Sequence, residues 1–301
     1  MESSRHVYER RLNAVIDHIE SHFDQALPLE TLADLAHFSP FHFHRIFKEY
    51  TGETPSVFVR RLRLQKALTQ METPSRPTLT DIALDCGFAQ SSDFTRAFRE
   101  VYGYPPSQHR KGRAGEDSKI RQDILANRGY GSTGSKESGD HFVVRVEELP
   151  AIRFAYVRVI GGFQPDRLLS GLDRLLTWGR SKGIYPGARL ATISPDNPEF
   201  VPVSRYRLDL CMEVPSGFAE TDELSYATVA SQRCAMLHCH GDIHKVHRGW
   251  THLFAHWLPD SGCEPTDAPS MELFRNSDDS QGWSILDLDC CVPVRPLRKE
   301  S

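Results

Sequence analysis

The N-terminal third of this chain contains one segment twice, and this duplication limits its possible folds more than any other feature. Residues 32–52 match residues 82–103 at an offset of 50 before an internal turn and 51 after it. Identical residues recur at this shift in the pairs Ala33/Ala83, Phe38/Phe88, Phe43/Phe94, Arg45/Arg96, Phe47/Phe98, Glu49/Glu100, Gly52/Gly103 and Pro55/Pro106. Each copy predicts a short helix, a turn near His37 or Gly87, and a second helix that ends at glycine. This is the helix-turn-helix arrangement.

The second helix of each copy has an apolar face and a polar face. Ser39 and Pro40 are residues that favour a helix start, so the first of these helices begins there. Apolar residues recur at helical spacing and are expected to pack: Phe43, Ile46 and Phe47 in the first copy, and Phe94, Ala97, Phe98 and Val101 in the second. The polar faces correspond as well, with Phe41, His44, Arg45 and Lys48 matched by Ser92, Thr95, Arg96 and Arg99.

These polar faces suit contact with DNA. Phe41 is an aromatic residue beside Arg45, a position from which it can contact a thymine methyl group. Arg45 and Arg96 can donate hydrogen bonds to guanine edges or to phosphates. The alternative for each arginine is a solvated surface charge. The repeated geometry favours the DNA contact.

A long helix is expected between the two copies, over residues 54 to about 73. A rigid helix fixes the separation of the two second helices, and helices about 34 Å apart can enter successive turns of the major groove. One chain can then read two half-sites. The helix also carries Arg60, Arg61, Arg63 and Lys66, which are either phosphate contacts or a solvated face.

Residues 8–110 resemble the seven-helix DNA-binding domain of the AraC/XylS family of transcription regulators. The resemblance rests on Ile82-Ala83, Gly87-Phe88, Phe94, Arg96, Phe98, Gly103, Pro105-Pro106 and His109-Arg110. It implies that the base-reading residues are Phe41, His44 and Arg45 in the first copy and Ser91, Ser92, Thr95 and Arg96 in the second. Phe41 and His44 stand where Trp and Gln are common in the family.

A change in composition separates this part from the rest of the chain. Residues 129–140 contain seven Gly or Ser residues, the composition of a flexible linker. Residues 1–113 carry 15 Lys and Arg against 14 Asp and Glu, whereas the remainder carries 21 against 26. The net charge of −4 therefore says little about a local basic face. We expect a DNA-binding domain over 1–113, a linker over 114–140 and a second domain over 141–301.

The second domain is expected to be α+β. A strand over 152–162, a helix over 166–182 and two further strands are followed by the same order from residue 234 onward. Two β-α-β-β units predict a pseudo-twofold domain with a groove between its halves, so the whole chain is α+β with an all-α first domain. This part resembles the GyrI-like effector-binding domain, through His240-Gly241-Asp242, Trp250, Trp257, and the segments PSMELF and LDLDCCVPV.

Glu272 is the candidate ligand-binding residue of the second domain. It alternates with Met271 and Leu273 on a short strand, so its side chain shares a face with Phe274. A carboxylate near aromatic rings suits an organic cation, and Trp283 is a further candidate. In the GyrI-like family the glutamate at this motif position lies in the effector pocket. The alternative is an edge-strand glutamate in water.

Other classes of protein are disfavoured. Eight His and Cys residues between 234 and 256 lack a zinc spacing, so no metal site is expected, and no nucleotide-binding or hydrolase motif or cofactor signature is present. The seven cysteines lack a C-x-x-C pair, and no apolar run reaches the 18 to 20 residues of a membrane span. We therefore expect a cytoplasmic, nucleoid-associated protein without catalytic residues.

The expected partners are double-stranded DNA, RNA polymerase and a small-molecule effector. Two rival functions remain for the second domain. One is hydrolysis of a small reactive substrate at Glu272 with Trp283 or Cys290. The other is inhibition of a partner protein such as a topoisomerase.

Overall fold

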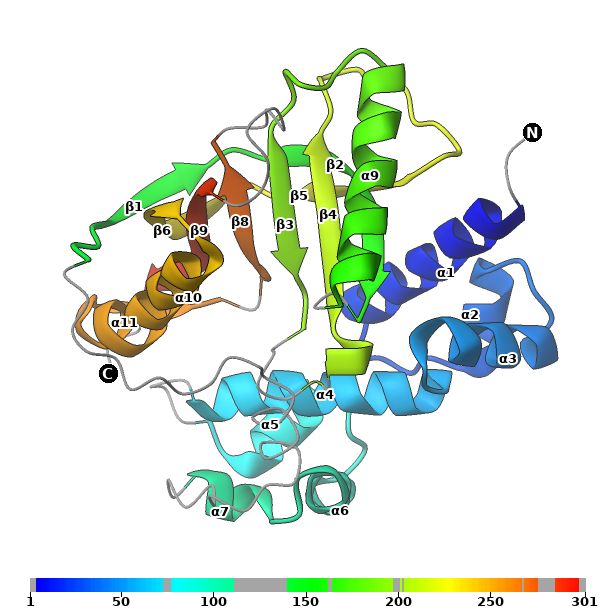
Figure 1. Cartoon of the computed structure of the whole chain (residues 1–301). Helices are drawn as coiled ribbons and strands as arrows, with labels where there is room; N and C mark the ends of the chain where they lie inside the picture. The colour runs from blue at the N-terminus through cyan, green and yellow to red at the C-terminus, as the bar shows by residue number, and fades with distance from the viewer. Residues whose placement is uncertain are drawn as a thin grey trace. The chain divides into compact units, whose positions relative to one another are not determined.

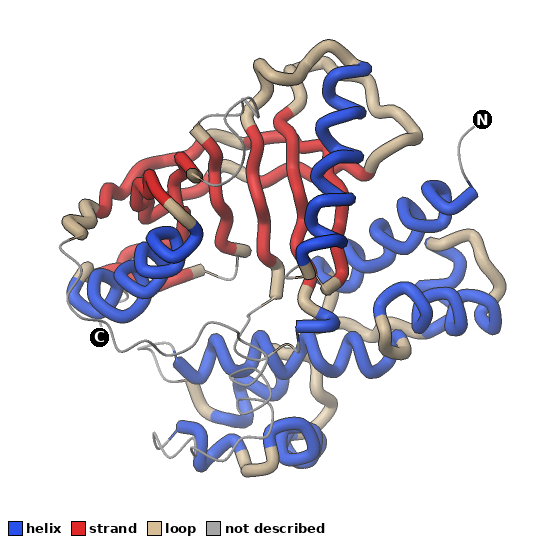
Figure 2. Tube along the Cα trace, in the orientation of Figure 1, coloured by secondary structure: helices blue, strands red, loops and turns tan. Residues whose placement is uncertain are grey.

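The computed structural model describes residues 4–72, 77–110, 140–161, 164–196, 201, 203–266, 268–275 and 285–297. The chain divides into two compact units, one helical and one built on an antiparallel sheet with helices, as Figures 1 and 2 show. This agrees with the predicted fold class. Most of the predicted linker, residues 114–139, lies outside the described residues.

The described part of the first unit contains seven helices. They are α1 (Ser4–Ser21), α2 (Leu29–Leu35), α3 (Pro40–Thr51), α4 (Pro55–Glu72), α5 (Leu79–Asp85), α6 (Ser91–Tyr102) and α7 (Pro106–Arg110). Helices α2 and α5 begin 50 residues apart, and α3 and α6 begin 51 residues apart. The duplicated helix-turn-helix and the long connecting helix are therefore confirmed.

The turns of the two copies use the same backbone conformation. His37 has φ 55° and Gly87, at the matching position, has φ 77°. A Cβ atom on Gly87 would lie 2.6 Å from the carbonyl oxygen of Asp24, so this copy has no room for a side chain. Ser39 caps α3 through its side chain, as its sequence position predicts. The two second helices therefore start from equivalent turns.

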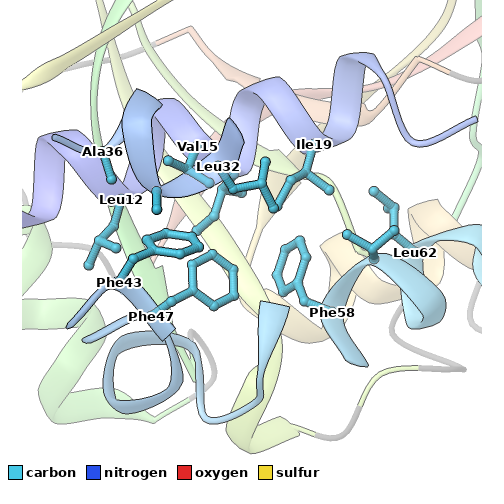
Figure 3. Packing of buried hydrophobic residues seen from close by; sticks show 12 residues of the cluster. Leu12, Val15, Ile19, Leu32, Ala36, Phe43, Phe47, Phe58 and Leu62 are labelled. Carbon is cyan, nitrogen blue, oxygen red and sulfur yellow. The ribbon is translucent and has the colours of Figure 1, made fainter. Parts of the chain in front are cut away.

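Two aromatic cores hold the first unit together, and α4 contributes to both. The first core contains Phe43, Phe47, Phe58 and Leu62, with the rings of Phe47 and Phe58 edge to face and their centroids 5.4 Å apart (Figure 3). The second contains Phe94 and Phe98 of α6, packed against the later part of α4 at Leu64, Ala67, Leu68 and Met71. Because one continuous helix is buried in both cores, the spacing of α3 and α6 is set by α4.

Arg61 of α4 is buried, and it is neither a phosphate contact nor part of a solvated face. Its Nε donates to Glu53 at 2.8 Å and its Nη1 donates to Gln65 at 3.1 Å. The side chain of Glu53 is only 2% exposed and that of Arg61 is 10% exposed. The guanidinium also lies 4.9 Å from the ring centroid of Phe58. Arg61 therefore ties the start of α4 to the first core.

Arg63 is also used inside the unit. It donates to the backbone carbonyls of Phe23 and Gln25, at 2.7 Å each, in the segment that joins α1 to α2. The ammonium group of Lys66 lies 5.7 Å from the centroid of the Phe23 ring. These contacts give the basic residues of α4 an intramolecular role that their sequence pattern did not indicate.

The second unit is built on a sheet with nine strands among its described residues. The strands are β1 (Val144–Leu149), β2 (Ile152–Ile160), β3 (Leu190–Ser194), β4 (Arg207–Glu213), β5 (Ser225–Val229), β6 (Gln232–Gly241), β7 (Cys263–Pro265), β8 (Ser270–Phe274) and β9 (Leu286–Pro296). They follow the order β1-β6-β9-β8-β3-β4-β2-β5, with β7 paired to β9. The helical segments are α9 (Pro165–Ser181), α10 (Ile243–Thr251), a π-helical segment η2 (His252–Trp257) and α11 (Leu258–Asp260). A 3-10 turn η1 (Val203–Arg205) precedes β4 in the sequence but groups with the first unit.

This sheet has an internal repeat of 80 residues. The two predicted units are β2-α9-β3-β4 and β6-α10-β8-β9, and they meet where β3 pairs with β8. At that junction Thr192 lies opposite Glu272, and these two residues are themselves 80 positions apart. The pseudo-twofold axis therefore passes between them. Identities at the same offset support the repeat: Ala155/Ala235, Gly161/Gly241, Leu208/Leu288, Asp209/Asp289, Cys211/Cys291 and Val214/Val294.

The edge strands of the two units are exchanged. Strand β1 leads into β2 but pairs with β6, and β5 leads into β6 but pairs with β2. Each half of the pseudo-symmetric sheet therefore has, as its edge strand, the strand that precedes the other half in the sequence. The exchange links the two units through backbone hydrogen bonds as well as through the β3–β8 junction.

The main helices pack on one face of the sheet at two separate places. Helix α9 packs on β2 and β4, and α10 packs on β6 and β9. Close approach is permitted by helical glycines, because a Cβ atom on Gly171 would lie 2.8 Å from Val159 and one on Gly249 would lie 2.6 Å from the Cys239 sulfur. The central strands β3 and β8 lie between these two contacts in the sheet (Figure 1).

Replacing Arg61 with alanine should destabilise the protein by about 1 to 3 kcal/mol, because it removes the buried guanidinium beside Glu53 and leaves that carboxylate with the partly exposed Arg205, whose Nη1 donates to it at 3.2 Å. Urea unfolding followed by circular dichroism measures this loss. Arg60→Ala is the matched control on the same helix. Its ion pair with Glu100 is exposed at both ends, so the change should stay below about 1 kcal/mol. Equal losses in the two variants would contradict the structural role of Arg61.

Candidate functional site

The outward face of α3 presents the residues that the sequence predicts there. Phe41 is 67% exposed, which is unusual for a large aromatic side chain, and Arg45 and Lys48 are also exposed. The guanidinium carbon of Arg45 lies 6.0 Å from the centroid of the Phe41 ring. His44 is half-buried at the side of the helix. An exposed ring and two cations therefore share one helix face.

The equivalent face of α6 carries polar residues. Ser92 and Arg96 are exposed, whereas Ser91 and Thr95 are half-buried. The Thr95 hydroxyl donates to the Ser91 carbonyl at 2.9 Å, so it is already used within the helix. Together the four predicted residues border a shallow hollow of about 550 Å³ that also includes Arg99 and Glu100.

A larger groove of about 570 Å³ lies between the two helix-turn-helix copies within the first unit. His44 of α3 and Arg96 of α6 both line it, so the structure brings together one predicted residue from each copy. Arg60 of α4 also lines the groove and donates to Glu100 of α6 at 3.0 Å. Of the four basic residues predicted on the connecting helix, Arg60 and Arg63 thus line the groove between the two copies.

Asp93 is a residue of this region that the sequence did not single out. Its Oδ1 accepts a hydrogen bond from Arg96 Nη2 at 2.8 Å, and both side chains are substantially exposed. An acidic residue in the first turn of a helix has an ordinary explanation in the helix dipole, so its sequence position gave no sign of a second role.

Glu272 lies at the pseudo-twofold axis of the second unit, half-buried on the face that carries the helices. One row of cross-strand neighbours runs from Leu210 through Thr192 and Glu272 to Cys290. Leu210 belongs to the hydrophobic cluster under α9, and Cys290 belongs to the cluster under α10. Glu272 is therefore positioned between the two helix contacts, as a site between the halves requires.

Two neutral donors hold the carboxylate of Glu272. Oε1 accepts from the indole N–H of Trp250 at 3.0 Å, and Oε2 accepts from the hydroxyl of Thr192 at 2.7 Å. No ion pair with a Lys or Arg is recorded for Glu272 within the described part of the chain. Thr192 was missed at the sequence level, although the 80-residue repeat would have identified it as the counterpart of Glu272.

One aromatic side chain, Trp250, contacts this carboxylate, and further aromatic residues lie on the same or adjoining elements. The Trp250 ring stacks on Phe254 with centroids 6.1 Å apart and an interplanar angle of 21°, and Phe254 is 47% exposed. Phe274 is half-buried and packs against the clusters under both helices. Burial raises the pKa of Tyr206, and the Glu272 charge contributes in the same direction, so its phenol stays neutral. Trp283 lies outside the described residues.

A pair of thiols lies next to this site. Cys290 is opposite Glu272 in the β8–β9 register, and its sulfur is 3.9 Å from that of Cys239. The contact with Cys239, together with burial, raises the pKa of the Cys290 thiol far above its usual value. Cys290 is therefore a protonated, weakly nucleophilic thiol at neutral pH.

The histidines and cysteines between 234 and 256 are spread over three elements: four lie on β6, and the later four histidines lie on α10 and η2. Cys239 is fully buried, whereas His238 is exposed and pairs with Asp287 at 2.7 Å. Within the described ranges, no three His, Cys, Asp or Glu side chains gather in a way that could hold a metal ion. Among the same residues, no helix has the length and apolar character of a membrane span.

Family models match both units. A helix-turn-helix domain model matches residues 32–112, and a GyrI-like small molecule binding domain model matches residues 142–295, about half of the chain.

Curated relatives are similar to part of the chain. The chain is 40% identical over 105 residues to the HTH-type transcriptional activator RhaS of Escherichia fergusonii, covering 35% of this chain and 37% of that protein. It is 31% identical over 134 residues to the right origin-binding protein of Escherichia coli K12, covering 44% of each. The chain thus spans less than half the length of these curated relatives.

Among solved structures, a probable AraC family transcriptional regulator from Rhodopseudomonas palustris is 30% identical, with a TM-score of 0.31, covering 34% of this chain and 95% of that one. The duplicated helix-turn-helix and the pseudo-twofold sheet are thus matched by separate families of domains. The chain belongs to the GyrI-like small-molecule-binding domain family through residues 142–295 and carries an AraC-type helix-turn-helix domain over residues 32–112.

Proposed function

We propose that this protein binds specific DNA sequences through α3 and α6 and regulates transcription in response to a small organic cation bound near Glu272. The observation that carries the DNA-binding part is the pair of equivalent helix faces that border one groove. Each face presents an exposed arginine at the same position, Arg45 or Arg96. A pair of such helices held by one rigid α4 fits successive major-groove segments.

Affinity and sequence choice would come from different contacts. Lys48 is a flexible exposed cation suited to a phosphate. Arg45 and Arg96 have the planar donors that match the O6 and N7 atoms of guanine, and the exposed Phe41 ring can pack on a thymine methyl group. His44, Ser91, Ser92 and Thr95 complete the proposed interface. Regulation would follow from an effect on RNA polymerase at the bound site, and DNA binding would place the protein at the nucleoid.

The observation that carries the sensor part is a held carboxylate without a cationic partner among the described residues. Trp250 and Thr192 fix both oxygens of Glu272 but leave its negative charge uncompensated. An organic cation would supply that charge, and aromatic rings such as Phe274 and Phe254 would contact its apolar part. We place Trp283 in the same site on its position in the sequence. The predicted groove between the two halves remains part of this proposal.

The rival function of hydrolysis has little support from the chemistry of Cys290. A catalytic cysteine needs a lowered thiol pKa and access to solvent. Cys290 is fully buried and the pKa of its thiol is raised. No observation on this unit favours inhibition of a partner protein over ligand sensing.

We propose residues 1–113 as the DNA-binding domain and 141–301 as the sensor domain. The fragment 1–113 should bind duplex DNA alone, because both aromatic cores and both second helices lie within it. Affinity measured by fluorescence anisotropy should fall with salt, with a logarithmic slope of about −0.9 for each phosphate contact. A folded fragment that binds no member of a random duplex library would contradict the proposal.

Substitutions of base-reading residues and of phosphate-contacting residues should have different effects on DNA binding. Arg45→Ala and Arg96→Ala should each lose about 1 to 3 kcal/mol on the preferred duplex and relax the choice at particular base pairs. Lys48→Ala should weaken binding to preferred and scrambled duplexes alike. Binding of each variant to a set of single-base-substituted duplexes measures both effects. A uniform loss in Arg96→Ala would make Arg96 a phosphate contact.

Glu272→Gln keeps the shape of the side chain and removes its charge, so it should weaken binding of a lipophilic organic cation while binding of a neutral isostere stays nearly unchanged. Calorimetry with both ligands on the full chain is the measurement. Glu213→Gln is a matched control, because Glu213 lies on the same sheet but pairs with Arg189. It should leave cation binding unaltered. Equal cation affinity in Glu272→Gln and the parent protein would remove Glu272 from the site.

A further inference from the structure

The two equivalent arginines of the helix-turn-helix copies are restrained in different ways. Arg45 lies over the ring of Phe41, with 6.0 Å between the guanidinium carbon and the ring centroid. Arg96 instead donates from Nη2 to Asp93 at 2.8 Å. In the second copy Ser92 stands at the position of Phe41, and in the first copy His42 stands at the position of Asp93. Each copy therefore has its own restraint, and neither has both.

The pair of Asp93 and Arg96 lies where DNA would lie. Both residues line the groove between the two copies, and Arg96 also borders the hollow along the outer face of α6. The side chain of Arg96 is 72% exposed and that of Asp93 is 42% exposed. An exposed ion pair of this kind adds little to folding stability. Its position on the proposed interface suggests an effect on binding instead.

We propose that Asp93 is a positioning residue that holds the guanidinium of Arg96 for contact with one base pair and thereby sets sequence choice there. This inference rests on the proposed role of Arg96 in reading DNA. Arginine has a long, flexible side chain, and ordering it on binding costs conformational entropy. A guanidinium carries five N–H donors, so one can stay with Asp93 while others donate to guanine O6 and N7.

The charge of Asp93 has a second effect, which is on affinity and not on sequence choice. A carboxylate at this interface is repelled by the phosphates of every duplex, which lowers affinity for all sequences. At the right base pair the held Arg96 gains its hydrogen bonds and offsets this repulsion. At a wrong base pair the repulsion remains without that gain. Asp93 thus lowers affinity for every duplex through its charge, whereas any gain in discrimination comes from its hold on Arg96.

Glu100 provides a natural control on the same helix. It is also acidic, exposed and part of the groove lining, but its partner is Arg60 of α4. Glu100 therefore shares the repulsion of phosphates without holding a proposed base-reading residue. The two acidic residues separate the effect of charge from the effect of positioning.

The experiment is a double-mutant cycle with the full-length protein. The preferred duplex is first selected from a random library, and binding is then measured to that duplex and to its single-base variants. The proteins compared are the parent, Asp93→Asn, Arg96→Ala, the double variant and Glu100→Gln. Asp93→Glu tests whether a carboxylate on a longer side chain restores the effect. Thermal unfolding of each variant identifies any loss of folding caused by removing a first-turn acidic residue from α6.

Asp93→Asn should reduce the preference at the base pair read by Arg96 by about 2- to 12-fold, the range expected when one long side chain must be ordered on binding. It should also bind scrambled DNA more tightly than the parent. Asp93→Asn should have no further effect on preference in the Arg96→Ala background. Glu100→Gln should raise affinity for all duplexes alike and leave the preference unchanged.

Three results would overturn the inference. A uniform affinity gain in Asp93→Asn, like that of Glu100→Gln, would reduce Asp93 to a charge effect. An equal loss of preference in the Arg96→Ala background would mean that Asp93 acts independently of Arg96. If Arg96→Ala itself kept the parent's preference among the single-base variants, Arg96 would have no base-reading role. The inference about Asp93 would then lose its premise. The last result alone also contradicts the base-reading role given to Arg96 in the proposed function, while DNA binding itself is tested separately by the fragment 1–113.

Discussion

The burial of one helix, α4, in two aromatic cores is the constraint on which the proposed DNA interface depends. Its first half packs on Phe43 and Phe47 through Phe58, and its second half packs on Phe94 and Phe98. Neither helix-turn-helix copy can shift along α4 without opening a close-packed core. The buried pair of Arg61 and Glu53 adds a charged contact at the start of the same helix. Two faces that could each bind DNA weakly are thereby held as one interface.

Both units of this protein are duplications in which equivalent positions have diverged. In the helical unit the matching arginines have different neighbours, Phe41 for one and Asp93 for the other. In the sheet unit the residue opposite Glu272 across the pseudo-twofold axis is Thr192, a neutral donor. A symmetric axis with two glutamates would place two like charges together, which is unfavourable. One glutamate with a hydroxyl partner gives a single held charge.

The remaining organisation follows from how a sheet with one helical face is built. Helices α9 and α10 each need a flat contact with the strands, and Gly171 and Gly249 allow that approach. Two such contacts placed symmetrically put the junction of β3 and β8 between them. Polar residues at this junction are therefore partly buried but not covered by a main helix contact. This partial burial is the physical basis of the ligand site proposed at Glu272.

The sequence by itself determined the helical unit almost completely. Local signals such as Ser39, Gly52 and Gly103 mark the helix ends, and the 50- and 51-residue offsets identify the equivalent outward faces. It also determined the order of both β-α-β-β units and the strand that carries Glu272. These features depend on short-range spacing, which can be read along the chain.

Only the tertiary structure decided which residues pair through hydrogen bonds and ion pairs and which strands lie next to one another. The donors to Glu272 come from residues 22 and 80 positions away, and Arg61 and Arg63 look like surface cations until their intramolecular partners are known. The exchange of β1 and β5 between the two halves was also not readable, because strand patterns do not name their neighbours. Side-chain chemistry is local to the sequence, whereas burial and pairing depend on which distant segments meet.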